Sequence, residues 1–275
     1  MLEIKNLSKR FGNQQVLDHI SLKIEKGKVI AVIGPSGTGK STLLRCINVL
    51  ERPEEGTIQL DDQIFDYEKL SKADIQVLRT RTSMVFQNSN LYRNKTALEN
   101  ITTPLTLVKK MPKEEADKIA LDLLEKVGVL EKKDAYPETL SGGEKQKIAC
   151  ASVAALFPSI IVMDEPTSNL DMKSISYLKE IIKKWKKSGK TVIIAEHKID
   201  LLAEYCDEII AMAEGRIIAQ GDTREVLANP ILREKGVRIP QTVSLAINME
   251  KEGIPLRNIP INKKEAIELL KEREV

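Results

Sequence analysis

The sequence contains no apolar run that approaches the roughly 18 residues needed to span a membrane. Its first residues, Met1–Ser8, lack the apolar stretch of a signal peptide. These two absences predict a cytoplasmic chain. It also has little excess charge of either sign, because 43 basic and 40 acidic residues leave a formal net charge of +3. The composition therefore gives no reason to expect nucleic acid as the main ligand.

Cysteine is scarce, and its three residues, Cys46, Cys150 and Cys206, lie far apart in the sequence. They show none of the short spacings that are typical of metal sites. Each lies among apolar residues, so we expect buried and reduced thiols. No internal repeat, low-complexity tract or flexible linker interrupts the 275 residues. The length suits one large domain with a small appendage.

Short apolar strands alternate with amphipathic helices along most of the chain. Lys28–Ile33, Ile160–Met163 and Thr191–Ala195 are typical of buried parallel strands. Pro112–Val127 and Lys173–Lys187 each carry an apolar stripe at helical spacing. The pattern predicts an α/β fold. An antiparallel layer is indicated near the start by Leu2–Leu7, Leu17–Ile24 and Thr57–Leu60.

A weak boundary at Asn229-Pro230 divides the chain into a main domain, 1–230, and a C-terminal extension, 231–275. The extension contains several prolines and short apolar runs, which predict a small packed unit. Its last helix is expected near Lys263–Lys271, with an apolar side made by Ile267, Leu269 and Leu270. The prolines are Pro240, Pro255 and Pro260.

Residues 34–41 read Gly-Pro-Ser-Gly-Thr-Gly-Lys-Ser and match the P-loop pattern at every fixed position. They follow an apolar strand and open a helix predicted over Ser41–Val49, which is the context that phosphate binding requires. We expect Lys40 to reach the β- and γ-phosphates and Ser41 to ligate Mg²⁺. A dinucleotide site fits poorly, because Thr42 stands where that motif has glycine or alanine. The candidate phosphate-binding residues are Gly34, Pro35, Ser36, Gly37, Thr38, Gly39, Lys40, Ser41 and Thr42.

Residues 160–166 read Ile-Ile-Val-Met-Asp-Glu-Pro, an apolar strand that ends in two carboxylates, Asp164 and Glu165. Downstream of a P-loop, Asp164 is placed to hold Mg²⁺ through water. Glu165 is then placed to polarise the attacking water as a general base. The combination predicts hydrolysis of a nucleoside triphosphate.

Leu140-Ser-Gly-Gly-Glu144 distinguishes this chain from other P-loop proteins. Ser141 and Glu144 form a capping-box pattern that would start a helix running through Ile148–Leu156. Gly142 and Gly143 lie inside it, so backbone donors and the helix dipole can face a phosphate. With this motif the chain resembles the ATP-binding subunits of ABC transporters, over about Met1–Asn229.

The resemblance implies roles for further residues. Phe11 stands where the family stacks an aromatic ring on adenine, and Gln87 matches the glutamine that senses Mg²⁺ and the membrane partner. Ser168-Asn-Leu-Asp171 matches the loop that crosses the dimer, which makes Asp171 a candidate nucleotide-site residue. His197 matches the histidine that contacts the γ-phosphate. Two departures from the commoner family pattern are Glu144 for glutamine and Asn169 for alanine.

The family architecture implies a RecA-like P-loop core with an antiparallel β layer and an inserted helical subdomain at about 88–158. In the family, the signature motif of one subunit closes ATP onto the P-loop of another. We therefore expect ATP and Mg²⁺ as ligands, and as partners a second, identical or related ATPase subunit and an integral membrane transport subunit. The implied location is the cytoplasmic face of the cell membrane.

Two importer branches compete. Ser41–Asn48 and Thr96–Asn100 look like polar amino acid importers. Glu144–Ser152, Ala195–His197 and the tail are similar to energy-coupling factor ATPases, which serve vitamin and metal uptake, and we favour this branch at the level of sequence. A soluble ABC protein acting on DNA or ribosomes usually has a coiled-coil insertion or two motor domains, which this chain lacks. A metabolic P-loop kinase would lack the signature motif and the histidine.

Overall fold

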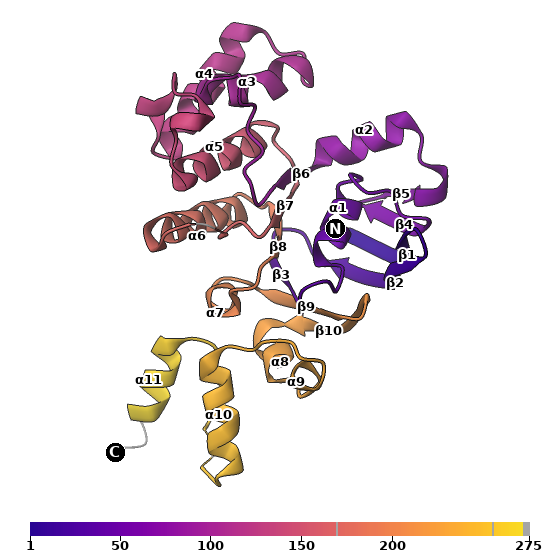
Figure 1. Ribbon diagram of the computed structural model, residues 1–275, viewed down its shortest axis with the longest axis vertical. Coiled ribbons are helices and arrows are strands. Elements are labelled where there is room, and N and C mark those ends of the chain that lie inside the picture. The colour runs from indigo at the N-terminus through magenta and orange to yellow at the C-terminus, as the bar shows by residue number, and fades with distance from the viewer. Residues whose placement is uncertain (169, 255, 272–275) are drawn as a thin grey trace.

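The computed structural model describes residues 1–168, 170–254 and 256–271 (Figure 1). Its centre is a six-stranded sheet in the order β10-β9-β3-β8-β7-β6. The five strands from β9 to β6 run parallel, whereas β10 pairs antiparallel with β9. The bounds are Val29–Ile33 (β3), Thr82–Val85 (β6), Ile160–Asp164 (β7), Thr191–Ala195 (β8), Glu208–Ala213 (β9) and Arg216–Asp222 (β10).

The central strands are apolar throughout because both faces of the sheet are covered. Every residue of β3, β7 and β8 is buried. Val29, Ala31 and Ile33 belong to one apolar cluster, and Ile30 and Val32 belong to the other. Since the parallel strands share one direction, the loops that follow β3, β7 and β8 leave the sheet at the same edge.

A smaller antiparallel sheet packs against the first helix. Its order is β2-β1-β4-β5, and the strands cover Leu2–Phe11 (β1), Gln14–Ile24 (β2), Glu55–Leu60 (β4) and Gln63–Asp66 (β5). Helix α1, Lys40–Ile47, lies in the same apolar cluster through Leu43 and Leu44. The predicted antiparallel layer is therefore present, with longer first and second strands than the sequence pattern indicates.

The segment between β6 and β7 forms a helical unit, at the top of Figure 1. It contains α3 (Ala97–Leu107), α4 (Lys113–Lys126) and α5 (Gly142–Ala155), which pack on one another around Ile101, Leu124 and Ile148. Short 3₁₀ helices, Leu130–Lys132 and Pro137–Thr139, join α4 to α5. Before β6, the chain forms the 3₁₀ helix Tyr67–Lys69 and then α2, Lys72–Arg81.

The second half of the main domain alternates helices with the remaining strands. Helix α6, Met172–Lys187, follows β7 and buries Ile175, Leu178, Ile182 and Trp185, the stripe that the sequence predicts. Helix α7, Ile199–Leu202, follows β8, and α8, Thr223–Ala228, follows β10. The predicted helix Pro112–Val127 corresponds to α4, one residue shorter at each end.

The C-terminal extension consists of α9 (Ile231–Glu234), α10 (Gln241–Lys251) and α11 (Lys263–Lys271), at the bottom of Figure 1. Leu232, Val237 and Val243 are buried in the same apolar cluster as β3 and α6. The tail is thus joined to the core of the main domain. In α11, Ala266 is buried, whereas Ile267 is 53% and Leu270 is 37% exposed. Pro255, one of the prolines noted in the tail, lies outside the described residues.

Helix α1 shows one boundary that the sequence pattern places wrongly. The predicted span Ser41–Val49 becomes Lys40–Ile47, because Asn48 caps the helix and Val49 adopts a left-handed backbone with φ of 54°.

The thiols largely agree with expectation. Cys46 and Cys150 are buried, and burial raises the pKa of each to about 12, whereas Cys206 is half-buried. Within the described residues, none of the helices is both long enough and apolar enough to cross a membrane.

Candidate active site

The P-loop connects β3 to α1 and needs glycine at position 39, immediately before the helix. Gly39 has a φ of 93°, and a Cβ atom there would lie 2.6 Å from Leu17 Cδ2 and 2.9 Å from the Val16 carbonyl oxygen. A larger residue would therefore push the loop away from β2. Thr38 Oγ donates a hydrogen bond of 2.9 Å to the Pro35 carbonyl, which closes the turn.

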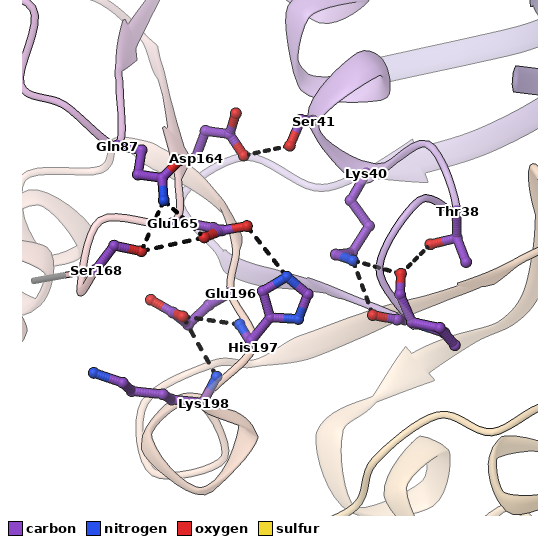
Figure 2. Close-up of polar contacts among 12 residues, drawn as sticks. Thr38, Lys40, Ser41, Gln87, Asp164, Glu165, Ser168, Glu196, His197 and Lys198 are labelled. Atoms are coloured by element: carbon purple, nitrogen blue, oxygen red, sulfur yellow. Dashed lines mark hydrogen bonds and ion pairs between the residues drawn. The ribbon is translucent and has the colours of Figure 1, made fainter.

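Lys40 folds back over its own loop (Figure 2). Its Nζ donates to the carbonyl oxygens of Gly34 and Pro35, both at 2.8 Å. The side chain is buried, and this burial lowers the pKa of Lys40. Both of these hydrogen bonds go to neutral carbonyls, and an ammonium group can exchange such acceptors for a phosphate, which is the stronger acceptor.

Ser41 and Asp164 meet across the sheet edge, although they are 123 residues apart. Ser41 Oγ donates to Asp164 Oδ1 at 2.8 Å, and Asp164 is only 6% exposed. Burial raises the pKa of the Asp164 carboxyl. A hydroxyl and a carboxylate oxygen at this spacing are ligands that Mg²⁺ accepts, so the pair fits the metal that the sequence predicts.

Glu165 is contacted by two side chains from distant segments, Gln87 and His197, and by Ser168 from its own loop (Figure 2). Its Oε2 accepts from Gln87 Nε2 at 3.2 Å and from Ser168 Oγ at 3.2 Å. Its Oε1 lies 3.1 Å from His197 Nε2. Glu165 also has a φ of 45°, a backbone conformation that residues with side chains adopt rarely. The structure thus brings together Gln87, Glu165 and His197, three residues to which the sequence analysis assigns roles around the reacting phosphate, and these are the candidate catalytic residues.

The signature residues lie apart from this cluster. Ser141 and Glu144 form the expected capping box at the start of α5, with Ser141 N donating to Glu144 Oε2 at 2.8 Å. Bonds from Ser141 hold the pKa of Glu144 below its usual value. Among the described residues, Ser141 and Glu144 make no hydrogen bond or ion pair with the P-loop.

Among the described residues, Asp171 and the candidate adenine residue Phe11 make no hydrogen bond or ion pair with this cluster, although Ser168, which precedes Asp171 in the same loop, belongs to it. Asp171 caps α6, because its Oδ1 accepts from Ser174 N at 2.7 Å. Asn169, the departure noted in this loop, lies outside the described residues. Phe11 is 47% exposed at the end of β1, with Lys9 Nζ 5.0 Å from its ring centre. An exposed ring is free to stack on a planar ligand.

Two features of the site are absent from the sequence prediction. Glu196, next to His197, is only 3% exposed and accepts hydrogen bonds from Thr167 and from the backbone of His197. A cleft of about 360 Å³ opens beside the P-loop, and the tail supplies part of its wall through Gly236 and Arg238. The sequence shows that Glu196 stands between the end of a strand and His197, but it does not show that Glu196 contacts Thr167.

Comparison with known proteins decides the family. The family model for ABC transporters matches residues 17–168, more than half of the chain. The chain belongs to the ABC transporter family. It is 44% identical over 230 residues to the probable amino-acid import ATP-binding protein YxeO of Bacillus subtilis (strain 168), covering 84% of this chain and 92% of that protein. It is 42% identical to the L-cystine import ATP-binding protein TcyN of the same organism, covering 82% and 87%.

Solved ABC structures share the fold. The cassette MJ0796, in a dimeric post-hydrolysis state bound to ADP and Pi, superposes with a TM-score of 0.74 at 32% identity, covering 82% of this chain and 99% of that chain. The cbiO1 protein of Clostridium perfringens, part of the transporter complex cbiONQ, gives a TM-score of 0.74 at 32% identity, covering 85% and 93%. The predicted P-loop ATPase fold is confirmed, and this ABC protein binds and hydrolyses ATP in the service of transport.

The relatives do not support the branch that the sequence analysis favours. The two import proteins named above act on amino acids and cystine, which agrees better with the alternative branch than with energy-coupling factor ATPases.

Proposed function

We propose that this chain is the ATP-hydrolysing subunit of an ABC importer for polar amino acids, including cystine. The observation that carries the proposal is the 44% and 42% identity to import proteins of this class over most of both chains. The P-loop helix and Thr96–Asn100, where α3 begins, carry the sequence resemblance to the same branch.

Uptake measurements test the cargo. Replacing the chromosomal copy with Glu165→Gln should abolish uptake of labelled cystine or another polar amino acid and leave vitamin, cobalt and nickel uptake unchanged. Glu180→Gln, an exposed carboxylate on α6 far from the site, is the matched control. If the variant loses vitamin or metal uptake but keeps amino acid uptake, the proposal is wrong and the chain serves an energy-coupling factor transporter.

At the site, Lys40 would hold the β- and γ-phosphates, with the backbone N–H groups of Ser36–Gly39 around them. Mg²⁺ would be held by the Ser41 hydroxyl, the Asp164 carboxylate and the amide oxygen of Gln87. When bound, this ion neutralises charge on the terminal phosphates. The support for this arrangement is the oxygen pair of Ser41 and Asp164 and the position of Lys40 beside it.

Glu165 would take a proton from the attacking water, and His197 would contact the γ-phosphate. The support is their placement at 3.1 Å, with Gln87 on the other carboxylate oxygen. The histidine and glutamine hold the Glu165 carboxylate in one orientation, and a fixed base is one that needs little rearrangement before it acts.

A complete nucleotide site would need two chains. The support is that, among the described residues, Ser141 makes no hydrogen bond with the P-loop of its own chain, and that the related cassette MJ0796 forms a dimer. In a head-to-tail dimer, Ser141–Glu144 and Asp171 of one chain would face Lys40 and Phe11 of the other. The second subunit is a copy or a close relative of this chain.

Mixing two inactive variants tests the shared site. Lys40→Ala and Ser141→Arg chains form mixed dimers in which one site carries both lesions and the other carries neither. Shared sites predict more ATPase activity in the mixture than in either variant alone. The absence of rescue, with mixed dimers shown to form, would show that sites are not shared or that both must work together.

The transport role also implies an integral membrane partner at the cytoplasmic face of the membrane, contacted through the helical unit α3–α5. Copurification of such a protein with the full-length chain tests this. Exclusive recovery with ribosomes or DNA would favour the soluble class instead.

We further propose that the tail, 231–275, supports contact between the two ATPase subunits. Gly236 and Arg238 lie in the cleft beside the P-loop, and Ile267 and Leu270 expose apolar surface on α11.

A further inference from the structure

Glu196 is a buried carboxylate in the loop after β8, next to His197, and the sequence motifs assign it no catalytic role. It follows the last residue of β8 and is 3% exposed. Within the described residues, Glu196 forms no ion pair, because no side-chain nitrogen of a lysine, arginine or histidine lies within 4.0 Å of its oxygens. A buried carboxylate without a close cation must be held by hydrogen-bond donors, so the identity of those donors shows what it does.

Its two oxygens face two different loops. Oε1 accepts from the backbone N–H groups of His197 at 2.8 Å and Lys198 at 3.4 Å (Figure 2). Oε2 accepts from the backbone N–H of Thr167 at 3.2 Å and from the Thr167 hydroxyl. Thr167 is itself 2% exposed and lies two residues after Glu165. The carboxylate therefore ties the loop after β7 to the loop after β8.

The loop after β7 carries Glu165 and the loop after β8 carries His197, and the proposed reaction depends on the distance between these two side chains. Glu165 and His197 meet at 3.1 Å, yet each is held to its own strand end by a short segment. Glu165 has an unfavourable positive φ, which persists only where the surroundings impose it. Lys198 Nζ adds a second link by donating to the Thr167 carbonyl at 3.3 Å.

We propose that Glu196 is a positioning residue that fixes the Glu165 loop and the His197 loop in one relative arrangement. This inference rests on the proposed roles of Glu165 and His197. A threonine or serine at position 196 would be too short to reach both loops, and a glutamine would turn an NH₂ group toward donors. A glutamate side chain has one oxygen for each of the two pairs of donors.

Glu196→Gln is nearly isosteric and tests the link in the full-length chain. The amide NH₂ group of glutamine cannot accept a hydrogen bond, so the donors of one of the two loops lose their acceptor. If the two loops then shift relative to each other, kcat should fall by roughly 5-fold to 100-fold. KM for ATP should stay within about twofold, because Lys40 and Ser41 are untouched. Glu204→Gln, an exposed carboxylate paired with Lys179, is the control and should leave both constants unchanged. A kcat for Glu196→Gln within about twofold of the parent overturns the proposal.

A second pair of variants keeps the test decisive if Glu196→Gln does not fold. Thr167→Val removes only the hydroxyl donor and should lower kcat by roughly threefold to tenfold, whereas Thr167→Ser restores the donor and should restore most of the rate. Equal rates for the valine and serine variants contradict the proposal.

Coupling to His197 distinguishes positioning from a general structural role. In a His197→Ala background, Glu196→Gln should cost less than about threefold in kcat, because the residue it positions is gone. If the fold-losses in kcat of the two single variants multiply in the double variant, Glu196 acts independently of His197, and the inference is overturned. Glu165→Gln is measured in parallel: if it is inactive while Glu196→Gln is fully active, only the positioning role fails, and if it is active, both fail.

Discussion

At the scale of single residues, the site is a set of groups that are each held by a neighbour. Glu165 illustrates this, since three side chains contact its carboxylate. Glu165→Gln keeps the shape but removes the base, so ATP binding should persist and turnover should fall by about 10²–10⁴-fold. Steady-state ATPase assays check this, with Glu180→Gln as control. Activity within about threefold of the parent would contradict the role of base.

Lys40→Ala acts at an earlier step. The ammonium group is the charge that lies against the P-loop carbonyls, and its loss should weaken ATP binding itself by at least about tenfold. Titration calorimetry with ATP measures this, and Lys184→Ala, an exposed lysine on α6, is the control. An unchanged ATP affinity in Lys40→Ala would be incompatible with the assignment.

The residues of the site differ in how far the sequence predicts them. Lys40, Ser41 and Asp164 follow from motif and strand context alone, because a P-loop and an acid at a strand end have defined places in the sheet. Thr167 and Glu196 do not, because their contact depends on which strands are neighbours. The pairing of β7 with β8 brings these loops together, and nothing in the spacing of 29 residues signals it.

At the scale of elements, the start of α5 is closely packed against α6. A Cβ atom at Gly143 would lie 2.2 Å from Ser174 Oγ and 3.2 Å from Ser174 Cβ. Gly143→Ala should therefore destabilise the fold by about 1–3 kcal/mol through overpacking. Adding Ser174→Ala removes the closest atom and should recover most of the loss. Denaturant unfolding measures both.

The double variant Gly143→Ala/Ser174→Ala should be more stable than Gly143→Ala. If the two variants have the same free energy of unfolding, a contact other than Ser174 limits the packing. Ser174→Ala alone is the reference, since it changes the serine without adding an atom at position 143.

The elements themselves are well predicted where the apolar period is regular. Helix α6 and strands β3, β7 and β8 agree with prediction because their burial is uniform along one stripe or on both faces. Helix α1 ends early because Val49 turns into a left-handed conformation, which a valine gives no reason to expect. Helix α11 has the predicted apolar residues, but Ile267 and Leu270 are exposed, because the helix packs through Ala266.

At the scale of the whole molecule, the tail is joined to the main domain in two ways. Val237 and Val243 complete its apolar core, and Arg224 of α8 pairs with Glu265 of α11 at 3.0 Å. Removing all of 231–275 would therefore expose the core as well as remove any contact surface. Substitutions at exposed tail residues separate these effects, since they leave the buried positions unchanged.

The last prediction concerns the exposed side of α11. Ile267 and Leu270 are three residues apart and share one helix face, so burial against a second subunit would account for two large apolar side chains in water. Ile267→Lys/Leu270→Lys should weaken ATP-dependent dimerisation of the Glu165→Gln chain by at least about tenfold, because apolar burial is replaced by a cost of desolvating charge. ATP affinity of the monomer should not change, and ATPase activity of the double variant with Glu165 intact should fall mainly at low protein concentration, where association limits the rate. Sedimentation measures the dimer, and Ile64→Lys on β5, an isoleucine that is 66% exposed in another part of the chain, is the control. If the double variant dimerises as tightly as its parent, α11 makes no contact between subunits and serves only its own domain.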